Sequence, residues 1–97
     1  MQSNSKLTAE QKDWLAIMSA LHPEIQFEVV GKTTFAFERQ GDIVEFATAI
    51  CNDTEKKQRN KVGKYYALNR YFDGHTVKLK LEDFNLMVTT IADKQYI

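Results

Sequence analysis

Apolar residues in the first quarter of the chain recur with the spacing of an α-helix. Four of them fall at intervals of three and four residues: Trp14, Ile17, Met18 and Leu21. Thr8 and Gln11 fit a capping box before this stripe, because the Thr8 hydroxyl can accept a backbone N–H and Gln11 can reach back. Pro23 disfavours helical geometry at the residue before it. The pattern therefore predicts a first helix that ends near Leu21, with the apolar stripe facing the core.

From residue 25 to residue 50 the hydrophobic period changes to two. The apolar members of this alternation are Ile25, Phe27, Val29, Phe35, Phe37, Val44, Phe46 and Ile50. Gly31-Lys32 and Gln40-Gly41 divide the segment at two points and suit tight hairpin turns. The pattern predicts a three-stranded meander with one buried face.

The remainder of the chain returns to helical spacing twice. Lys56 to Phe72 predicts a second helix, closed by Gly74 at a left-handed C′ position. Residues 76–81 alternate apolar and polar side chains, which predicts a fourth strand. This strand either follows a crossover connection or lies at an edge of the sheet. A last helix is expected from about Glu82 to Ala92.

These elements give the order α-β-β-β-α-β-α in a single domain of residues 1–97. Hairpin strands with helices before and after them predict an α+β fold. We expect a small antiparallel sheet of about four strands, with the helices packed on one face.

Composition narrows the class of protein. The chain has 97 residues, of which 43% are hydrophobic, so a single globular core is expected. No run approaches the ~18 apolar residues of a membrane span, and residues 1–6 lack the apolar stretch of a signal peptide. The one cysteine, Cys51, cannot form an internal disulfide. A cytoplasmic location, in the host if the chain is encoded by a phage, is therefore predicted.

The zero net charge hides a separation of charges along the chain. Residues 56–72 carry six basic and no acidic side chains, whereas residues 1–55 carry nine acids and four bases. Unpaired cations on one helix repel each other unless an anion lies nearby. The candidate ligand-binding residues are those of this helix that can contact phosphate or carboxylate, with one amide in the preceding turn: Asn52, Arg59, Lys61, Lys64 and Arg70. The alternative is a solvated basic face.

Gly63 and Ala67 lie one turn apart and form a strip without bulk on the second helix. A mid-helix glycine costs about 0.5–1 kcal/mol relative to alanine, so something should compensate for it. One interpretation is close approach of a ligand or partner to the helix backbone, and the other is close packing by another element of the same fold.

Other chemistry is not indicated. His22, His75 and Cys51 lack the spacing of metal ligands, and the four glycines are scattered instead of forming a phosphate loop. We therefore expect no metal, no cofactor and no enzymatic activity.

The pair Cys51-Asn52, followed by Gly63, Ala67 and Arg70 in a basic helix, resembles a pattern in small phage and prophage proteins. Lys64 stands where arginine is usual in that pattern. Some proteins of this kind are anti-defence proteins, and the Thoeris anti-defence sponges among them sequester a cyclic ADP-ribose signal. The resemblance implies a phage-encoded binding protein without catalysis.

The sequence thus predicts a small inhibitor of host defence or regulation that binds an anionic partner through residues 56–72. That partner is a nucleotide signal or an acidic surface of a host protein. A nucleic-acid-binding regulator is the first alternative, although the acidic excess of residues 1–55 disfavours extended contact with a phosphate backbone. The second alternative is a protein–protein inhibitor that acts as a homodimer.

Overall fold

A computed structural model describes residues 7–50 and 56–95, except for the side chains of residues 56–59 and 94–95. The three helices are α1 (Ala9–Leu21), α2 (Lys56–Phe72) and α3 (Leu81–Gln95). The four strands are β1 (Gln26–Val30), β2 (Thr33–Gln40), β3 (Ile43–Ile50) and β4 (Val77–Lys80). The predicted element order and the α+β class are confirmed. None of the described helices is long and apolar enough to cross a membrane.

The ends of the helices form as their local sequences predict. Thr8 caps α1: its hydroxyl accepts the Gln11 N–H at 3.1 Å, and the Gln11 side chain accepts the Thr8 N–H at 2.9 Å. At the end of α2, Gly74 has a φ of 85°, a conformation that glycine adopts without a Cβ clash. The Gly74 and His75 N–H groups bond to carbonyls of the last turn, which satisfies two of its free acceptors.

The sheet is antiparallel throughout, in the order β1-β2-β3-β4. Gly31 and Gly41 take positive φ values of 59° and 64° in the two hairpin turns. Of the two placements left open for the fourth strand, the structure shows the edge position, with Val77 opposite Phe46 and Lys80 opposite Ile43. The Leu81 N–H bonds to the Asp42 carbonyl at 2.6 Å, so the start of α3 is tied to the second hairpin turn.

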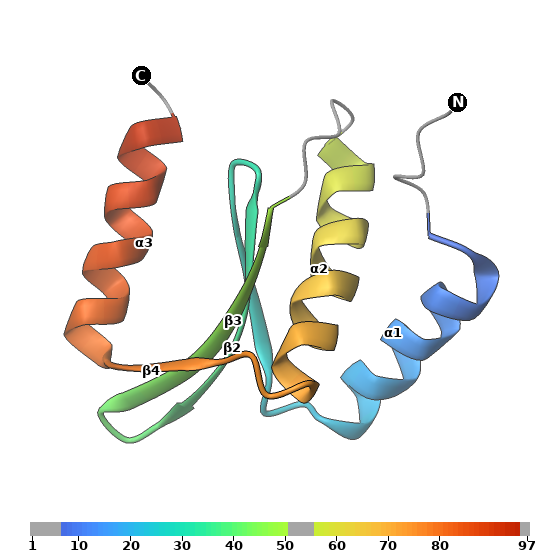
Figure 1. Cartoon of the computed structure of the whole chain (residues 1–97), viewed down its shortest axis with the longest axis horizontal. Helices are drawn as coiled ribbons and strands as arrows, with labels where there is room; N and C mark the ends of the chain where they lie inside the picture. The colour runs from blue at the N-terminus through green and yellow to red at the C-terminus, as the bar shows by residue number, and fades with distance from the viewer. Residues whose placement is uncertain (1–6, 51–55, 96–97) are drawn as a thin grey trace.

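The sequence predicts that all the helices pack on one face of the sheet, and this prediction is wrong. Figure 1 shows α1 and α2 on one side of the sheet and α3 on the other. Two separate hydrophobic clusters confirm this arrangement, one that contains Ala67 and Leu68 of α2 and one that contains Phe84 of α3. In residues 33–37 of β2 and 46–50 of β3 the side chains on both faces are apolar or small, so both faces of this part of the sheet require a cover.

The two faces differ in the size of their side chains. On the α2 face, neighbouring strands present Thr34, Ala36, Ala47 and Ala49. On the α3 face they present Phe35, Phe37, Val44 and Phe46. The register places Ala36 opposite Ala47 and Phe37 opposite Phe46, so each face keeps its own character across the two strands.

The apolar stripe expected on α1 lies only partly in the core. Trp14, Leu15 and Met18 pack against the α2-face cluster. Ile17 and Leu21 are 56% and 66% exposed. Trp14 stacks edge-on against Tyr65 and Phe72 of α2, with centroid distances of 5.3 and 6.3 Å. These contacts rotate α1 so that Leu15, outside the predicted stripe, takes the inward place of Ile17.

Candidate functional site: a lysine groove between two helices and an edge strand

A groove of about 510 Å³ lies between α1, α2 and the edge strand β1. We call it the lysine groove. Its lining residues are Leu7, Lys12, Leu15, Ala16, Ser19, Phe27, Lys61 and Lys64. Most of the lining surface is apolar, and the groove is open to solvent. Its volume lies within the ~300–1,000 Å³ of typical binding sites.

Two of the predicted site residues meet in this groove. Lys61 and Lys64 are three residues apart on α2, so they project from the same side of that helix. Lys61 is exposed, whereas Lys64 is half-buried and holds its Nζ 5.7 Å from the centre of the Phe27 ring. Two of the predicted basic side chains of the helix therefore lie on one side of it, next to a groove with a mostly apolar lining.

α1 contributes the third cation of the groove, Lys12. No carboxylate is among the lining residues, so the three ammonium groups add to one local positive field. Across residues 7–50 and 60–93, the contact of a basic side chain with a carboxylate within 4.0 Å is the one between His22 Nδ1 and Glu24, at 3.0 Å. The groove thus holds uncompensated positive charge next to apolar surface.

Arg70 lies on a different side of α2 from the lysine groove. Its Nη1 donates a 2.8 Å hydrogen bond to the Thr48 carbonyl of β3. The guanidinium is exposed, so its other donors remain accessible. The structure therefore does not bring Arg70 together with Lys61 and Lys64. Asn52 lies outside the described residues, as does the side chain of Arg59.

Gly63 and Ala67 are buried against the sheet and offer no surface to a ligand. A Cβ on Gly63 would overlap Oγ1 of Thr34 and lie 3.0 Å from its Cβ. Of the two interpretations of this glycine, close packing within the fold is the one the structure supports. The candidate role of these residues in approach by a ligand or partner is wrong, because β2 already occupies the space.

Two tyrosines of the basic helix have different surroundings. Tyr71 is half-buried, and its hydroxyl donates to Glu38 Oε1 at 3.2 Å. Burial, together with the nearby Glu45 and Glu38 carboxylates, raises the pKa of Tyr71 well above its usual value. Tyr71 therefore belongs to the packed layer between α2 and the sheet. Tyr66 is 43% exposed and remains accessible.

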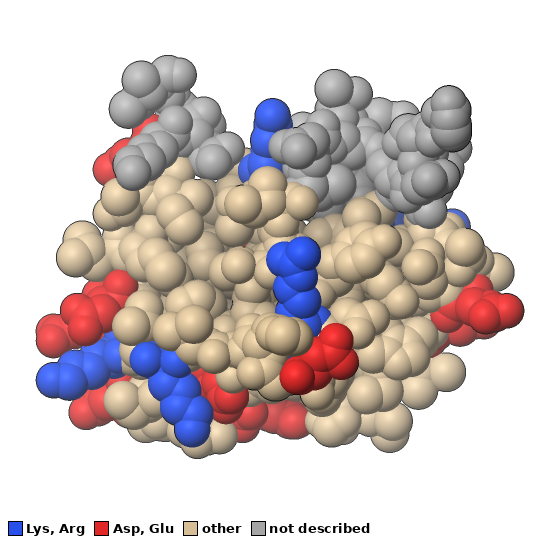
Figure 2. Space-filling view, in the orientation of Figure 1, with Lys and Arg blue, Asp and Glu red and all other residues tan. Residues whose placement is uncertain are grey.

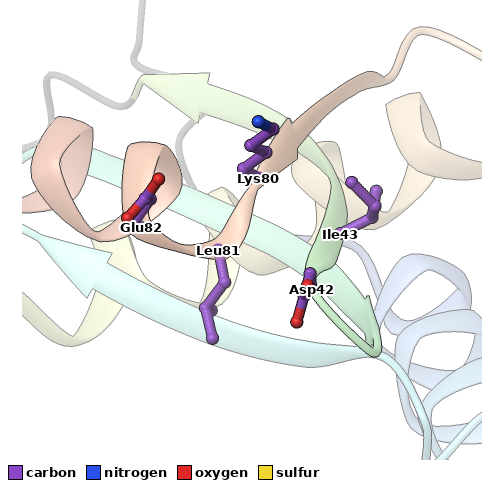
Figure 3. A pocket seen from close by; sticks show the side chains of 5 residues that line it. All are labelled: Asp42, Ile43, Lys80, Leu81 and Glu82. Atoms are coloured by element: carbon purple, nitrogen blue, oxygen red, sulfur yellow. The ribbon is translucent and has the colours of Figure 1, made fainter.

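A second hollow, of about 600 Å³, lies beside the second hairpin turn and the start of α3. Its lining residues are Asp42, Ile43, Lys80, Leu81 and Glu82. Figure 3 shows that the side chains of Lys80 and Asp42 point away from each other, to opposite sides of the ribbon. Charged groups that do not converge cannot hold one ligand, so the lysine groove is the better candidate site.

The described residues show no group of three His, Cys, Asp or Glu side chains that could hold a metal ion. His22 forms a hydrogen bond with Glu24. Cys51 lies outside the described part of the chain.

Sequence reasoning found Lys61 and Lys64 but missed Lys12, Leu15 and Phe27 as parts of the same site. Lys12 reads as an ordinary exposed charge, and Phe27 as one member of an alternating strand. That these residues belong to one site follows only from the tertiary structure, because it depends on which side of α2 faces α1.

Comparison of the chain with protein-family models, with curated proteins and with solved structures finds no match.

Proposed function

We propose that this chain is a small non-catalytic inhibitor, of the kind encoded by phages, that binds an acidic segment of a host protein through the lysine groove. The observation that carries the binding part of this proposal is the convergence of Lys12, Lys61 and Lys64 around Phe27 and Leu15. The inhibitory role is supported by the resemblance of the basic helix to small phage proteins.

The lining of the groove favours a protein segment over a nucleotide. The lining is mostly apolar and the groove is open to solvent, whereas sites for small molecules usually enclose 70–90% of the ligand surface. The cations are lysines, which act as point charges without the planar fork by which arginine binds phosphate. An amphipathic helix with leucines on one face and glutamates beside them would satisfy both the floor and the rim.

Isothermal titration calorimetry tests this directly. The first probe is a synthetic Leu/Glu amphipathic helix, and the second is a panel of cyclic nucleotides and ADP-ribose derivatives. We expect heat with the helix and an affinity that falls as salt rises, because mobile ions screen the lysines. Heat with the nucleotides alone would replace the protein partner with a nucleotide signal, and no heat with either probe would contradict the proposal.

Matched charge-reversal variants locate the site. Lys61→Glu/Lys64→Glu reverses two charges in the groove, and Lys78→Glu/Lys80→Glu reverses two charges on β4. We expect the first pair to lower the affinity at least about tenfold, as the loss of about 1.4 kcal/mol implies. The second pair should leave it nearly unchanged. Equal losses would show that net charge matters and the groove does not.

A second candidate is self-association through the outward side of α1. Three large apolar side chains are exposed there: Ile17, Leu21 and Phe72 are 56%, 66% and 38% exposed. Exposed apolar surface that is contiguous often marks a site of protein–protein contact. Leu86 of α3 is also 66% exposed and provides a control on the other side of the sheet. Sedimentation velocity should show a dimer that Leu21→Glu dissociates and Leu86→Glu does not. A monomer in the unmodified chain would exclude this candidate.

A further inference from the structure

Only half of β3 is covered by the edge strand β4. β4 pairs with Ile43–Phe46, and among the described residues no strand pairs with the same side of Ala47–Ile50. In Figure 1 this part of β3 rises between α2 and α3 beyond the end of β4. An uncovered edge presents backbone donors and acceptors in the spacing that another strand requires.

The hydrogen-bond directions in β3 identify which backbone groups face this edge. Successive residues of a strand direct their peptide groups to opposite edges, and the two-residue turn at Gly41-Asp42 directs those of Ile43 toward β2. Thr48, five residues further on, therefore directs its N–H and carbonyl to the β4 side, and its carbonyl accepts from Arg70. The N–H and carbonyl of Ile50 therefore point to this side as well. Arg70 occupies one acceptor of the edge with a side chain in place of a strand.

The side chains around this edge differ between its two faces. Ile50 and Val77 lie on the α3 face, in line with Phe46, and are 69% and 55% exposed. Arg70 lies on the α2 face, with Tyr66 one turn before it on the same helix. Figure 2 shows basic and acidic side chains side by side in the middle of this view, with uncharged surface around them. An incoming strand would thus meet apolar surface on one face and a guanidinium on the other.

No described carboxylate lies within ion-pair distance of Arg70. A partner backbone N–H could take the place of Arg70 on the Thr48 carbonyl, and the released guanidinium could bind a partner carboxylate in two-pronged geometry. The exchange leaves both the Thr48 carbonyl and the Arg70 guanidinium with a hydrogen-bond partner. The charge of Arg70 therefore selects an acidic residue on that face of the strand.

We propose that Ala47–Ile50 of β3 accepts an extended segment of a partner protein, with acidic side chains toward Arg70 and apolar side chains toward Ile50 and Val77. This is a strand-addition surface. It shares no lining residue with the lysine groove, so the two sites can be tested separately.

The probe is the peptide acetyl-Val-Glu-Val-Glu-Val-amide. Its binding is measured by NMR, from the signals of the backbone amides of the full chain. We expect shifts and slowed hydrogen exchange at the Thr48 and Ile50 amides. A control peptide has the same sequence but is N-methylated at the residues whose backbone N–H groups would face β3. It should not bind, because it lacks these hydrogen-bond donors. Shifts at Lys61 and Lys64 without shifts in β3 would place the acidic peptide in the lysine groove and overturn this proposal alone.

Two variants isolate the components of this surface. Arg70→Gln should weaken the peptide about tenfold, as the loss of one charge-assisted hydrogen bond implies. Arg39→Gln is the matched control, because Arg39 likewise donates to a backbone carbonyl, that of Gly41, at 2.9 Å. Ile50→Pro removes an outward N–H that strand pairing within the sheet does not use, and it should abolish binding. Unchanged affinity in Arg70→Gln and Ile50→Pro, with circular dichroism showing both folded, would overturn the proposal.

Discussion

Each face of the sheet is covered by a helix, but one face is built from large aromatic side chains and the other from small ones. On the α3 face, Phe84 meets Phe35, Phe37 and Phe46 with ring centroids 5.8, 5.1 and 5.3 Å apart. On the α2 face, Gly63 and Ala67 meet threonine and alanine, and the helix backbone comes close to the strands.

This difference determines where each helix can carry function. The aromatic face holds α3 by large interdigitating rings, and the residues of its cluster are all apolar. The small-residue face brings the flanks of α2 down to the level of the sheet. Lys64 therefore reaches Phe27 on one side of the helix, and Arg70 reaches Thr48 on the other. Close packing in the middle thus places basic side chains over both borders of the sheet.

The largest expected effect lies on the aromatic face. Phe84→Ala removes a ring that contacts three other phenylalanines, and it should lower the free energy of unfolding by about 3–5 kcal/mol. Urea denaturation followed by circular dichroism measures this. Leu86→Ala, at an exposed position on the same helix, should change stability by no more than about 0.5 kcal/mol. Similar values for the two variants would contradict the two-cluster core.

On the small-residue face the sign of the effect is diagnostic. If α2 were free of the sheet at Gly63, Gly63→Ala would stabilise the helix by about 0.5–1 kcal/mol. Because the new methyl group would overlap Thr34, we expect a loss of about 1–3 kcal/mol instead. Thr34→Ala in the same chain should recover part of that loss, and a double-mutant cycle measures the coupling. Additive effects would show that these residues do not touch.

The α2 face should also respond to alkaline pH. Tyr71 has a raised pKa when the chain is folded, so the folded state keeps a proton that the unfolded state releases above about pH 10. Stability is therefore lost as pH rises through that range. Tyr71→Phe should cost about 0.5–1.5 kcal/mol at neutral pH, through the lost bond to Glu38, and should reduce the alkaline slope. Identical slopes in urea titrations at pH 8 to 11 would exclude Tyr71 as the cause.

The smallest effect is expected at the border of the α2 face. Lys64→Gln removes the cation above Phe27 and should lower stability by about 0.5 kcal/mol. Lys61→Gln removes an exposed charge that has no ring contact and should leave stability unchanged, so the two variants separate ring contact from general charge. Thermal melts in parallel can resolve this difference. An equal effect of both variants would indicate repulsion between lysines and no specific contact with the ring.

Much of the secondary structure follows from local sequence. The bounds of α2 are those predicted, because Gly74 ends the helix by backbone geometry alone. The capping box at Thr8 and the glycine turns at Gly31 and Gly41 form for equally local reasons. The last helix is longer than predicted: it begins at Leu81 and extends to Gln95.

The candidate site was less predictable. In the sequence, Gly63 and Ala67 form a strip without bulk that suits either a ligand or internal packing, and in the structure both lie against the sheet. Large apolar side chains are the usual guide to the core face of a helix. Phe72 is in fact 38% exposed, and Ala67 is fully buried. Side-chain size misleads when the opposing sheet is itself built of small residues.

The order of the elements, the α+β class and the accumulation of positive charge on α2 follow from the amino-acid sequence, since these depend on short-range periodicity and on counting. Three features depend on how the elements pack: which side of α2 faces the sheet, the position of α3 on the other face, and the approach of Lys12 to Lys61 and Lys64. The reason is physical: the rotation of a helix about its axis is set by the surface against which it packs, and that surface is made by residues distant in the chain.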